Sequence, residues 1–212
     1  MTTALFTHAA CLHHDTGSGH PERMQRLSAV LHGLKGAEFA AVKWREAPRA
    51  EIAQIARSHD EDYVRAALAA VPERGWAHLD GDTVLSPGSG EAALRAAGAV
   101  TAAVDAVLQG EFKNAFCAVR PPGHHAERDV AMGFCVFNNV AIGAEQARAV
   151  HGLKRVAVMD FDVHHGNGTQ HIFAADPDLF YASTHQMPLY PGTGARTERG
   201  VSNICNAPLE PG

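Results

Sequence analysis

The sequence predicts an α/β protein built on one open, mostly parallel β-sheet with helices on both faces. Short apolar segments typical of strands alternate along the chain with longer segments of helical periodicity, and this alternation favours a parallel sheet that is covered on each side. No internal repeat, low-complexity tract or linker interrupts the 212 residues. With 46% apolar and 19% charged residues, the chain can bury a sizeable core. We therefore expect a single domain over residues 1–212.

Five segments have the length and composition of strands, and most are rich in apolar, β-branched or aromatic residues. They cover residues 4–8, 41–47, 114–121, 155–162 and 179–184. The clearest helix is predicted over residues 89–110, where apolar residues recur at spacings of three and four, Ser89 can cap the start and Gly110 suits the end. Further helices are expected over residues 22–34, 50–70 and 138–151.

The composition excludes several classes of function. Lys and Arg total 18 against 23 Asp and Glu, which gives a net charge of -5, and no basic block could neutralise a row of phosphates. Binding to nucleic acid is therefore not expected. No run of about 18 apolar residues could span a bilayer, and the first residues do not resemble a signal peptide. The four cysteines are scattered without a CxxC pair, so we expect reduced, mostly buried thiols in a cytoplasmic protein.

Polar residues at the end of one expected strand are the first sign of a site. The stretch "VAVMDFDVHHGN" begins as a buried strand, and residues 160–167 form the loop at its carboxyl end, where α/β sheets bind ligands. Alternate residues of an extended chain share a face, so Asp160, Asp162 and His164 should point the same way. A carboxylate beside an imidazole suits Zn²⁺, although catalytic zinc needs three protein ligands. The alternative is a buried hydrogen-bonded pair that caps the next helix.

A second polar cluster follows another expected strand, in the segment "RPPGHHAER". The prolines and glycine cannot extend a helix, so His124 and His125 should lie on a constrained loop. Histidine can take up and release a proton near neutral pH, as a hydrolytic site requires. Asp160 and Asn167 could accept hydrogen bonds from the two rings and fix their orientation. A surface pair, or two histidines bonded to backbone carbonyls in the core, is the alternative.

Three further segments carry little weight alone. "HPERMQRL" can be a capped helix start, "LDGDTVLSPGSG" contains Asp82 in a turn-rich loop, and "QMPLYPGTG" places Tyr190 beside a proline. Asp82 could equally be a solvated or capping residue, and Tyr190 could be a packing residue.

Together these segments resemble the histone deacetylase superfamily, especially bacterial class II histone deacetylase-like amidohydrolases. The resemblance rests on five motifs in the family's order, from His20 to about Pro208: "HPERMQRL", "DGDTVLSPGSGEAALRAAGA", "RPPGHHAERDVAMGFCVFNNVAIGA", "VMDFDVHHGNGTQHIF" and "YASTHQMPLYPGTG". Five ordered motifs are far more specific than any one of them. The resemblance implies the arginase/deacetylase fold, an open, mostly parallel sheet with helices on both sides.

The resemblance also implies roles for the two polar clusters. Asp162 and His164 match two of the three zinc ligands of the family. His125 matches the general base that later acts as an acid, and His124 matches a mainly electrostatic neighbour. Asp160 matches the aspartate paired with the first histidine. Asn167 stands where other members have an aspartate paired with the second histidine, and this asparagine fits the class II pattern.

The substrate and the metals are implied in the same way. The substrate-binding matches are Phe134 and Tyr190 as the walls of a narrow acyl-lysine channel, Gly133 alongside, and Asp82 at the rim. A structural potassium ion would be bound by Asp160, Ser183 and Thr184, with the backbone carbonyls of Asp162 and His164. A second monovalent cation site would fall around Phe173, Asp176 and Leu179.

The implied reaction is zinc-assisted hydrolysis of an acyl-lysine amide in a peptide or protein, or of a related small amide such as an acetylpolyamine. One departure from the family matters. Its third zinc ligand, an aspartate, and its oxyanion donor, a tyrosine, belong to later motifs that this sequence lacks. We therefore expect the N-terminal two-thirds of a longer protein, incomplete at its C-terminus, with exposed apolar surface and no activity by itself.

Two other functions stay open at this point. A manganese ureohydrolase of the arginase type could use the same fold, but it needs several converging aspartates, and Asn167 stands where one of them might be. A non-catalytic pseudo-deacetylase could bind acyl groups or a protein without hydrolysis. The sequence gives no indication of the oligomeric state.

Overall fold

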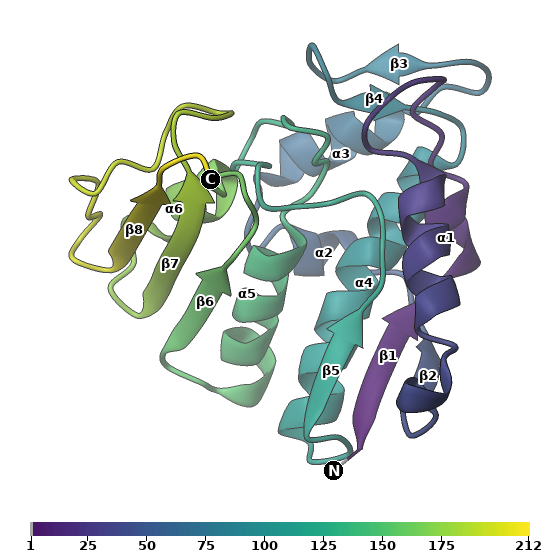
Figure 1. Cartoon of the computed structure of the whole chain (residues 1–212), viewed down its shortest axis with the longest axis horizontal. Coiled ribbons are helices and arrows are strands. Elements are labelled where there is room, and N and C mark those ends of the chain that lie inside the picture. Colours follow the sequence, from purple (N-terminus) through teal and green to yellow (C-terminus); the bar gives the residue numbers. More distant parts are fainter. Residues whose placement is uncertain (1) are drawn as a thin grey trace.

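The computed structural model describes residues 2–212. Most strands belong to two parallel sheets of three strands each, and the arrows of both sheets point the same way (Figure 1). The first sheet has the order β2 (Lys43–Glu46), β1 (Thr3–Thr7), β5 (Asn114–Cys117). The second has the order β6 (Val156–Asp160), β7 (Leu179–Gln186), β8 (Ile204–Leu209). A small antiparallel hairpin joins β3 (Ala77–His78) to β4 (Val84–Leu85).

The first sheet is covered on both faces because alternate residues of β1 point to opposite sides. Ala4 and Phe6 pack against the alanine-rich face of α4 (Ser89–Leu108). Leu5 packs on the other side against Leu27 of α1 (Met24–Gly33). Smaller helices complete this half of the molecule: η1 (Ala9–Leu12), η2 (Ala37–Phe39), α2 (Ile52–Ile55) and α3 (Glu61–Ala69).

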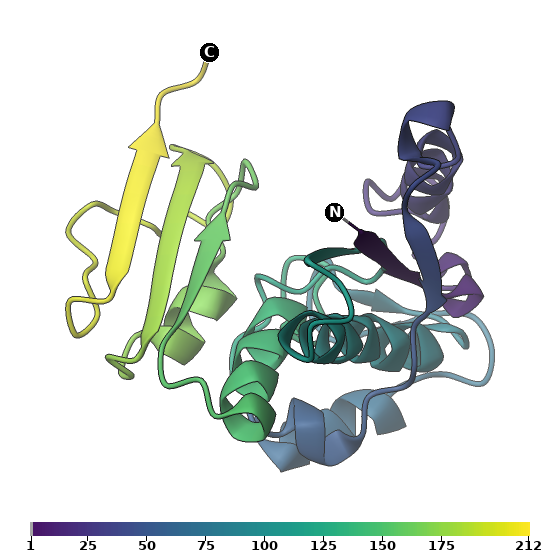
Figure 2. The ribbon, with the colours of Figure 1, turned by 90° about the horizontal axis from the view of Figure 1, so that it is seen from below.

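The second sheet is covered on one face only within residues 2–212. Leu179 and Tyr181 of β7 pack against α5 (Asn139–His151) and α6 (Asn167–Phe173). Figure 2 shows both helices on the side that faces the rest of the molecule. Helix α5 also packs closely on α4: a Cβ at Gly143 would lie only 2.4 Å from a methyl carbon of Val100. This helix pair holds the two sheets in one molecule.

The α/β class, the parallel strands and the flanking helices are confirmed, with three differences in detail. The helix expected over 50–70 is divided into α2 and α3, because the chain turns at Ser58 and His59 and the Asp60 N–H donates to Arg128 O at 3.0 Å. The hairpin, α6 and β8 were not expected. Third, the expected single sheet is two sheets, since β5 and β6 do not pair.

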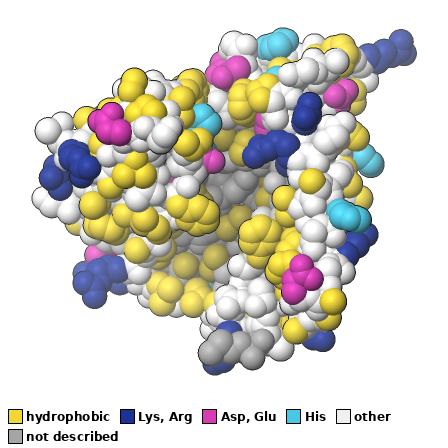
Figure 3. Space-filling model, in the orientation of Figure 1, with side chains coloured by type: hydrophobic (Ala, Val, Ile, Leu, Met, Phe, Trp, Pro, Cys, Tyr) yellow, Lys and Arg dark blue, Asp and Glu magenta, His cyan; other side chains and the backbone are white. Residues whose placement is uncertain are grey.

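Between β5 and β6 lies a hollow with a volume of about 460 Å³. Figure 3 shows it as the depression between the two halves of the molecule. Its lining is largely apolar and includes Val119, Val158, Met159 and Phe161. Met159 is 58% and Phe161 86% exposed, so the hollow offers uncovered apolar surface beside two strand edges.

No helix within residues 2–212 is long and apolar enough to cross a membrane. All four cysteines are free: Cys11 and Cys135 are buried, Cys117 is half-buried and Cys205 is exposed. A cytoplasmic location stays a prediction from the sequence.

Candidate active site

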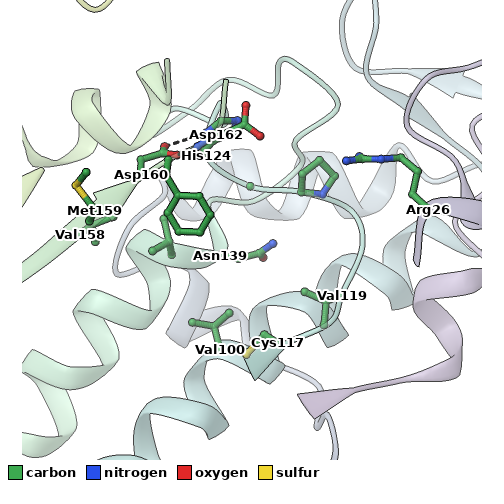
Figure 4. A pocket seen from close by; sticks show the side chains of 14 residues that line it. Arg26, Val100, Cys117, Val119, His124, Asn139, Val158, Met159, Asp160 and Asp162 are labelled. Atoms are coloured by element: carbon green, nitrogen blue, oxygen red, sulfur yellow. Dashed lines mark hydrogen bonds and ion pairs between the residues drawn. The ribbon is translucent and has the colours of Figure 1, made fainter. Parts of the chain in front are cut away.

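The loop after β5 brings His124 and His125 to the carboxyl end of the first sheet. Gly123 allows this path, because a Cβ there would lie 2.6 Å from the backbone nitrogen of Asn139, at the start of α5. The two imidazole rings lie next to each other, with their centroids 4.0 Å apart. At the upper end of the hollow, Figure 4 shows His124 together with Asp160 and Asp162. Asp160 is the last residue of β6 in the second sheet, and Asp162 lies on the loop after it.

Asp160 fixes the orientation of His124. The Nδ1 atom of His124 lies 2.9 Å from Asp160 Oδ2, and the Tyr181 hydroxyl donates to the same oxygen at 3.0 Å. Burial raises the pKa of Asp160, but the hydrogen bonds from His124, the Asp162 N–H and Tyr181 outweigh burial and hold the pKa below its usual value. An ionised carboxylate accepts hydrogen bonds only, so His124 carries its proton on Nδ1.

Asn167 has the same relation to His125. The Nδ1 atom of His125 lies 2.8 Å from Asn167 Oδ1, while Asn167 Nδ2 donates to Glu127 at 2.9 Å. The Glu127 carboxylate therefore fixes which end of the amide faces the ring, and His125 must donate through Nδ1. Burial lowers the pKa of His125 to about 4, and the neighbouring His124 contributes. His125 is neutral at pH 7, with an Nε2 lone pair that can accept a proton.

Asp162 and His164 lie side by side on the loop after β6. Asp162 Oδ1 is 3.0 Å from His164 Nδ1 and also accepts the His164 backbone N–H at 2.8 Å. The two side chains are 49% and 38% exposed, and α6 begins after Gly166 without a side-chain cap, so they are not a buried helix-capping pair. The His164 ring lies 6.0 Å from the His125 ring. The predicted ligands and the predicted base therefore share one site.

A carboxylate and an imidazole are suitable donors for zinc, but they are only part of a coordination shell. Within residues 2–212 no group of three or more His, Cys, Asp or Glu side chains is placed to hold a metal ion. Asp162 and His164 therefore fit the implied metal as a pair, and the described residues supply no third ligand.

The predicted substrate residues surround the two histidines. The Tyr190 ring stands edge-on to His125, with a centroid distance of 5.0 Å. Gly133 also lies against His125, because a Cβ there would be 2.4 Å from the ring. Phe134 has a positive φ of 68°, and its backbone N–H donates to Thr83 Oγ1 at 3.2 Å. Asp82 accepts the Gly133 N–H at 3.2 Å, and burial together with Asp80 raises its pKa.

The predicted potassium ligands lie deeper, beneath the site. Asp160 and Ser183 are register partners in β6 and β7, and Thr184 follows in β7. Ser183 Oγ lies 2.9 Å from His185 Nδ1. The predicted second cation site has a different occupant: the carbonyl oxygens of Phe173, Asp176 and Leu179 converge on Asn203 Nδ2 at 2.8, 2.8 and 2.6 Å. An amide group of the chain itself therefore occupies the position expected for that cation.

Sequence reasoning missed several residues that shape the site. They are His20, Thr83, Glu127, His165, His185 and Glu198. The His20 ring lies 4.8 Å from the ring of Phe134. Five of them carried a signal, because they lie inside the quoted motifs: His20, Thr83, Glu127, His165 and His185. Glu198 lies outside those motifs and acts through hydrogen bonds that no local pattern predicts.

Comparisons with known proteins agree with this geometry. The family model of the histone deacetylase domain matches residues 20–212. Uncharacterized protein slr0245 of Synechocystis is 43% identical, over 99% of this chain and 70% of the relative. The histone deacetylase-like amidohydrolase of Pseudomonas aeruginosa is 40% identical, over 99% of this chain and 61% of the relative.

The crystal structure of the HDA15 HD domain superposes with a TM-score of 0.92 at 34% identity, over 98% of this chain and 61% of that one. The chain thus spans 61% to 70% of the length of these three proteins. Since the family model covers most of the chain and the relatives match it over nearly its whole length, the protein belongs to the histone deacetylase family.

Proposed function

We propose that the chain carries the base-containing part of a zinc-dependent amidohydrolase that removes acetyl or longer acyl groups from lysine side chains, or from small amides such as acetylpolyamines. The observation that carries this proposal is the paired arrangement of His124 and His125. Each ring is held through Nδ1 by an acceptor of its own, and both lie beside a carboxylate-imidazole pair. This arrangement leaves the Nε2 atom of each ring free to face a substrate.

Each of the polar residues at the site would have its own role in the hydrolysis. His125 would take a proton from the attacking water through Nε2 and later deliver it to the departing amine. His124, paired with ionised Asp160, would stabilise positive charge beside it. Asp162 and His164 would hold the zinc ion, which when bound polarises the acyl carbonyl and acidifies water. Asn167, itself fixed by Glu127, would keep His125 in the tautomer that this role needs.

The substrate would enter between two aromatic rings. Phe134 and Tyr190 would flank the aliphatic stem of an acyl-lysine or a polyamine, with Gly133 leaving room beside His125. Asp82, already bonded to the Gly133 N–H, would bind the backbone of the substrate at the rim.

We also propose the structural potassium ion, bound by Asp160, Ser183 and Thr184. The hydrogen bonds around Ser183 support it. His185 Nε2 faces the Gly194 carbonyl at 3.0 Å and must donate to it, so His185 Nδ1 accepts the Ser183 hydroxyl hydrogen. The hydroxyl proton is thus directed away, and the Ser183 oxygen keeps its lone pairs for a cation.

We propose further that the third zinc ligand and the oxyanion donor come from polypeptide other than residues 1–212. The hollow between β5 and β6 supports this. The facing edges of two parallel sheets border about 460 Å³ of largely apolar space, and strands inserted there would join the sheets and cover Met159 and Phe161. The chain alone is then inactive.

Two proteins test these proposals with an acetyl-lysine peptide. The chain alone should show no turnover in the presence of zinc, and zinc-dependent turnover would refute its incompleteness. A chimera that joins residues 1–212 to the C-terminal remainder of the Pseudomonas aeruginosa relative should hydrolyse the peptide. His125→Ala in this chimera should abolish turnover while the zinc content is retained, and His32→Ala, an exposed histidine of α1, should change neither.

The same chimera separates the alternatives. Peptide binding without hydrolysis would indicate a pseudo-deacetylase, and manganese-dependent release of urea from a guanidino compound would indicate a ureohydrolase. Turnover that survives His125→Ala would overturn the assignment of the base.

A further inference from the structure

A buried network of polar side chains lies beside the candidate site, and apart from the contact of His185 with Ser183 it has no part in the proposed function. It joins β7, β8 and the start of α6 to residues 187–199, which we call the Tyr190 loop. Two histidines form its centre: the rings of His165 and His185 lie 4.8 Å apart and are 1% and 2% exposed. Gly194 of the loop rests directly on both rings, because a Cβ there would lie 2.5 Å from His185 and 2.6 Å from His165.

Glu198 closes the Tyr190 loop on itself. Its Oε1 atom accepts the backbone N–H groups of Gly194 at 3.0 Å and Ala195 at 2.9 Å. Its Oε2 atom accepts the amide of Gln170, on α6, at 2.6 Å. One carboxylate therefore fixes the backbone four residues after Tyr190 and ties it to the helix that follows the metal-ligand loop.

The same carboxylate determines the direction of the network. A carboxylate has no hydrogen to donate, so the NH₂ group of Gln170 must face Glu198 and its oxygen must face His165 Nε2, at 2.9 Å. His165 then donates through Nε2, and its Nδ1 accepts the hydroxyl of Thr193, on the Tyr190 loop, at 2.8 Å. Glu198 thus binds the loop twice, once directly and once through Gln170 and His165.

The Oδ1 atom of Asn206, buried and unpaired among the described residues, shows how strongly Glu198 determines which groups of the network donate and which accept. The Gln170 oxygen also accepts the amide of Asn206 at 2.7 Å, and this orientation leaves Asn206 Oδ1 buried without a partner within residues 2–212. If Asn206 and Gln170 were both reversed, that oxygen would gain a donor, but the Gln170 oxygen would then face the Glu198 carboxylate. The unpaired oxygen is the less costly of the two arrangements.

We infer that Glu198 is a positioning residue that holds Tyr190 against His125 and so sets the width of the substrate channel. The inference rests on the proposed function for the channel, but the placement of the ring is independent of turnover. Tyr190 touches the site from a loop that is also held by two other contacts: the Met187 N–H donates to Leu209 O at 2.9 Å, and the Gly194 carbonyl accepts from His185 at 3.0 Å. Glu198 adds the two backbone hydrogen bonds to Gly194 and Ala195 and the link through Gln170. Without the carboxylate, the loop loses its backbone acceptor and the constraint on His165, and the ring moves away from the base.

Fluorine NMR of the chain labelled with 3-fluorotyrosine tests this directly, because there are three tyrosines and Tyr190→Phe identifies one resonance. Glu198→Ala should move the Tyr190 resonance towards that of free fluorotyrosine and narrow it, while the half-buried Tyr63, whose hydroxyl donates to Val136 O at 2.6 Å, stays in place as a reference for folding. Glu198→Gln should restore the Tyr190 resonance, since an amide keeps an acceptor for both backbone N–H groups and lets the network run in the reverse direction. Glu111→Ala, which removes an exposed partner of Arg45, is the matched control.

A Tyr190 resonance that stays in place in Glu198→Ala overturns the inference. If that variant also shifts Tyr63 and is therefore misfolded, Thr193→Val decides: it deletes only the hydroxyl that holds the loop to His165, and an unmoved Tyr190 resonance there overturns the inference equally. In the chimera, Glu198→Ala should raise KM about tenfold with little change in kcat, which corresponds to about 1.4 kcal/mol of lost binding. A displaced ring in a chimera without turnover would refute the proposed function and leave the role of Glu198 intact.

Discussion

The buried ion pair between Glu22 and Arg120 gives a prediction whose size follows from the structure. Glu22 precedes α1 and Arg120 precedes the histidine loop, and the two residues are 1% and 3% exposed. The Arg120 guanidinium binds both carboxylate oxygens, one of them at 2.6 Å through Nε, and donates to Cys11 O at 3.0 Å. The pair therefore ties three segments together beneath the site.

Arg120→Met keeps the length of the side chain but removes the charge and all its donors. The Glu22 carboxylate is then buried with only the ring of His14 nearby, at 3.9 Å. Removing one partner of a buried pair costs about 3–5 kcal/mol, because the remaining charge has lost its compensation. With a urea m-value of about 1–3 kcal/mol/M, the midpoint should fall by at least about 1 M.

Urea unfolding followed by circular dichroism measures this change. Arg65→Met is the matched control: Arg65 pairs with Glu61 on the surface of α3, both side chains are more than half exposed, and such pairs contribute about 0.5 kcal/mol. Glu22→Leu combined with Arg120→Met should recover much of the loss, since no charge is then left buried. A loss below about 1 kcal/mol, or a double variant no more stable than Arg120→Met, would refute the reasoning.

Three further predictions concern other buried groups. Burial lowers the pKa of His59 from 6.5 to about 4, so the free energy of unfolding should fall by up to about 3 kcal/mol as the pH drops from 6.5 to 4. In urea titrations, His59→Gln should reduce this dependence of the unfolding free energy on pH. An unchanged pH dependence contradicts the prediction. Gly166→Ala should separate Asp160 from His124, because the new Cβ would lie 2.3 Å from the carboxylate, and the His124 Nδ1–H signal in ¹⁵N NMR should disappear; a retained signal argues against it. Asn203→Ala should destabilise the fold by at least about 2 kcal/mol. If a cation can replace the amide, potassium should restore part of that lost stability. Equal melting temperatures of the variant in potassium and choline buffers would exclude this replacement.

The secondary structure was predictable where it depends on a pattern of neighbouring residues alone. The periodicity of residues 89–110 corresponds to α4, and the apolar run before Asp160 corresponds to β6. The split of the helix expected over 50–70 was not predictable. It depends on the buried ring of His59, which faces the Arg128 carbonyl at 3.1 Å and accepts the Asn138 N–H at 2.8 Å, and both partners are distant in the sequence.

The same distinction applies to the sheet. Strand identity follows from composition, but strand neighbours follow from the path of the whole chain. The alternation of strands and helices predicts parallel pairing without predicting that β5 and β6 are separated by a hollow. Nothing local in "NAFC" or "VAVMD" distinguishes an edge facing a hollow from an edge facing a partner.

The site shows what polar motifs can predict. Residues on one loop, such as Asp162 and His164, are placed together by the alternation of an extended backbone. The contact of Tyr190 with His125 depends on a network through Glu198 that is set by tertiary packing. Motifs therefore predicted the chemical groups, while the supports that fix their positions came from the structure.

The two halves of the candidate site differ in how far this chain fixes them. His125 and Asn167 are 4% and 7% exposed, and Glu127 completes their hydrogen bonds, so the chain itself holds the proposed base in its orientation. Asp162 and His164 lie in the open, beside the uncovered hollow and next to Phe161 at 86% exposure. The described residues therefore fix the histidine pair more firmly than the carboxylate-imidazole pair. His124 and Asp162 both line the hollow, so polypeptide that filled it would contact both halves of the site.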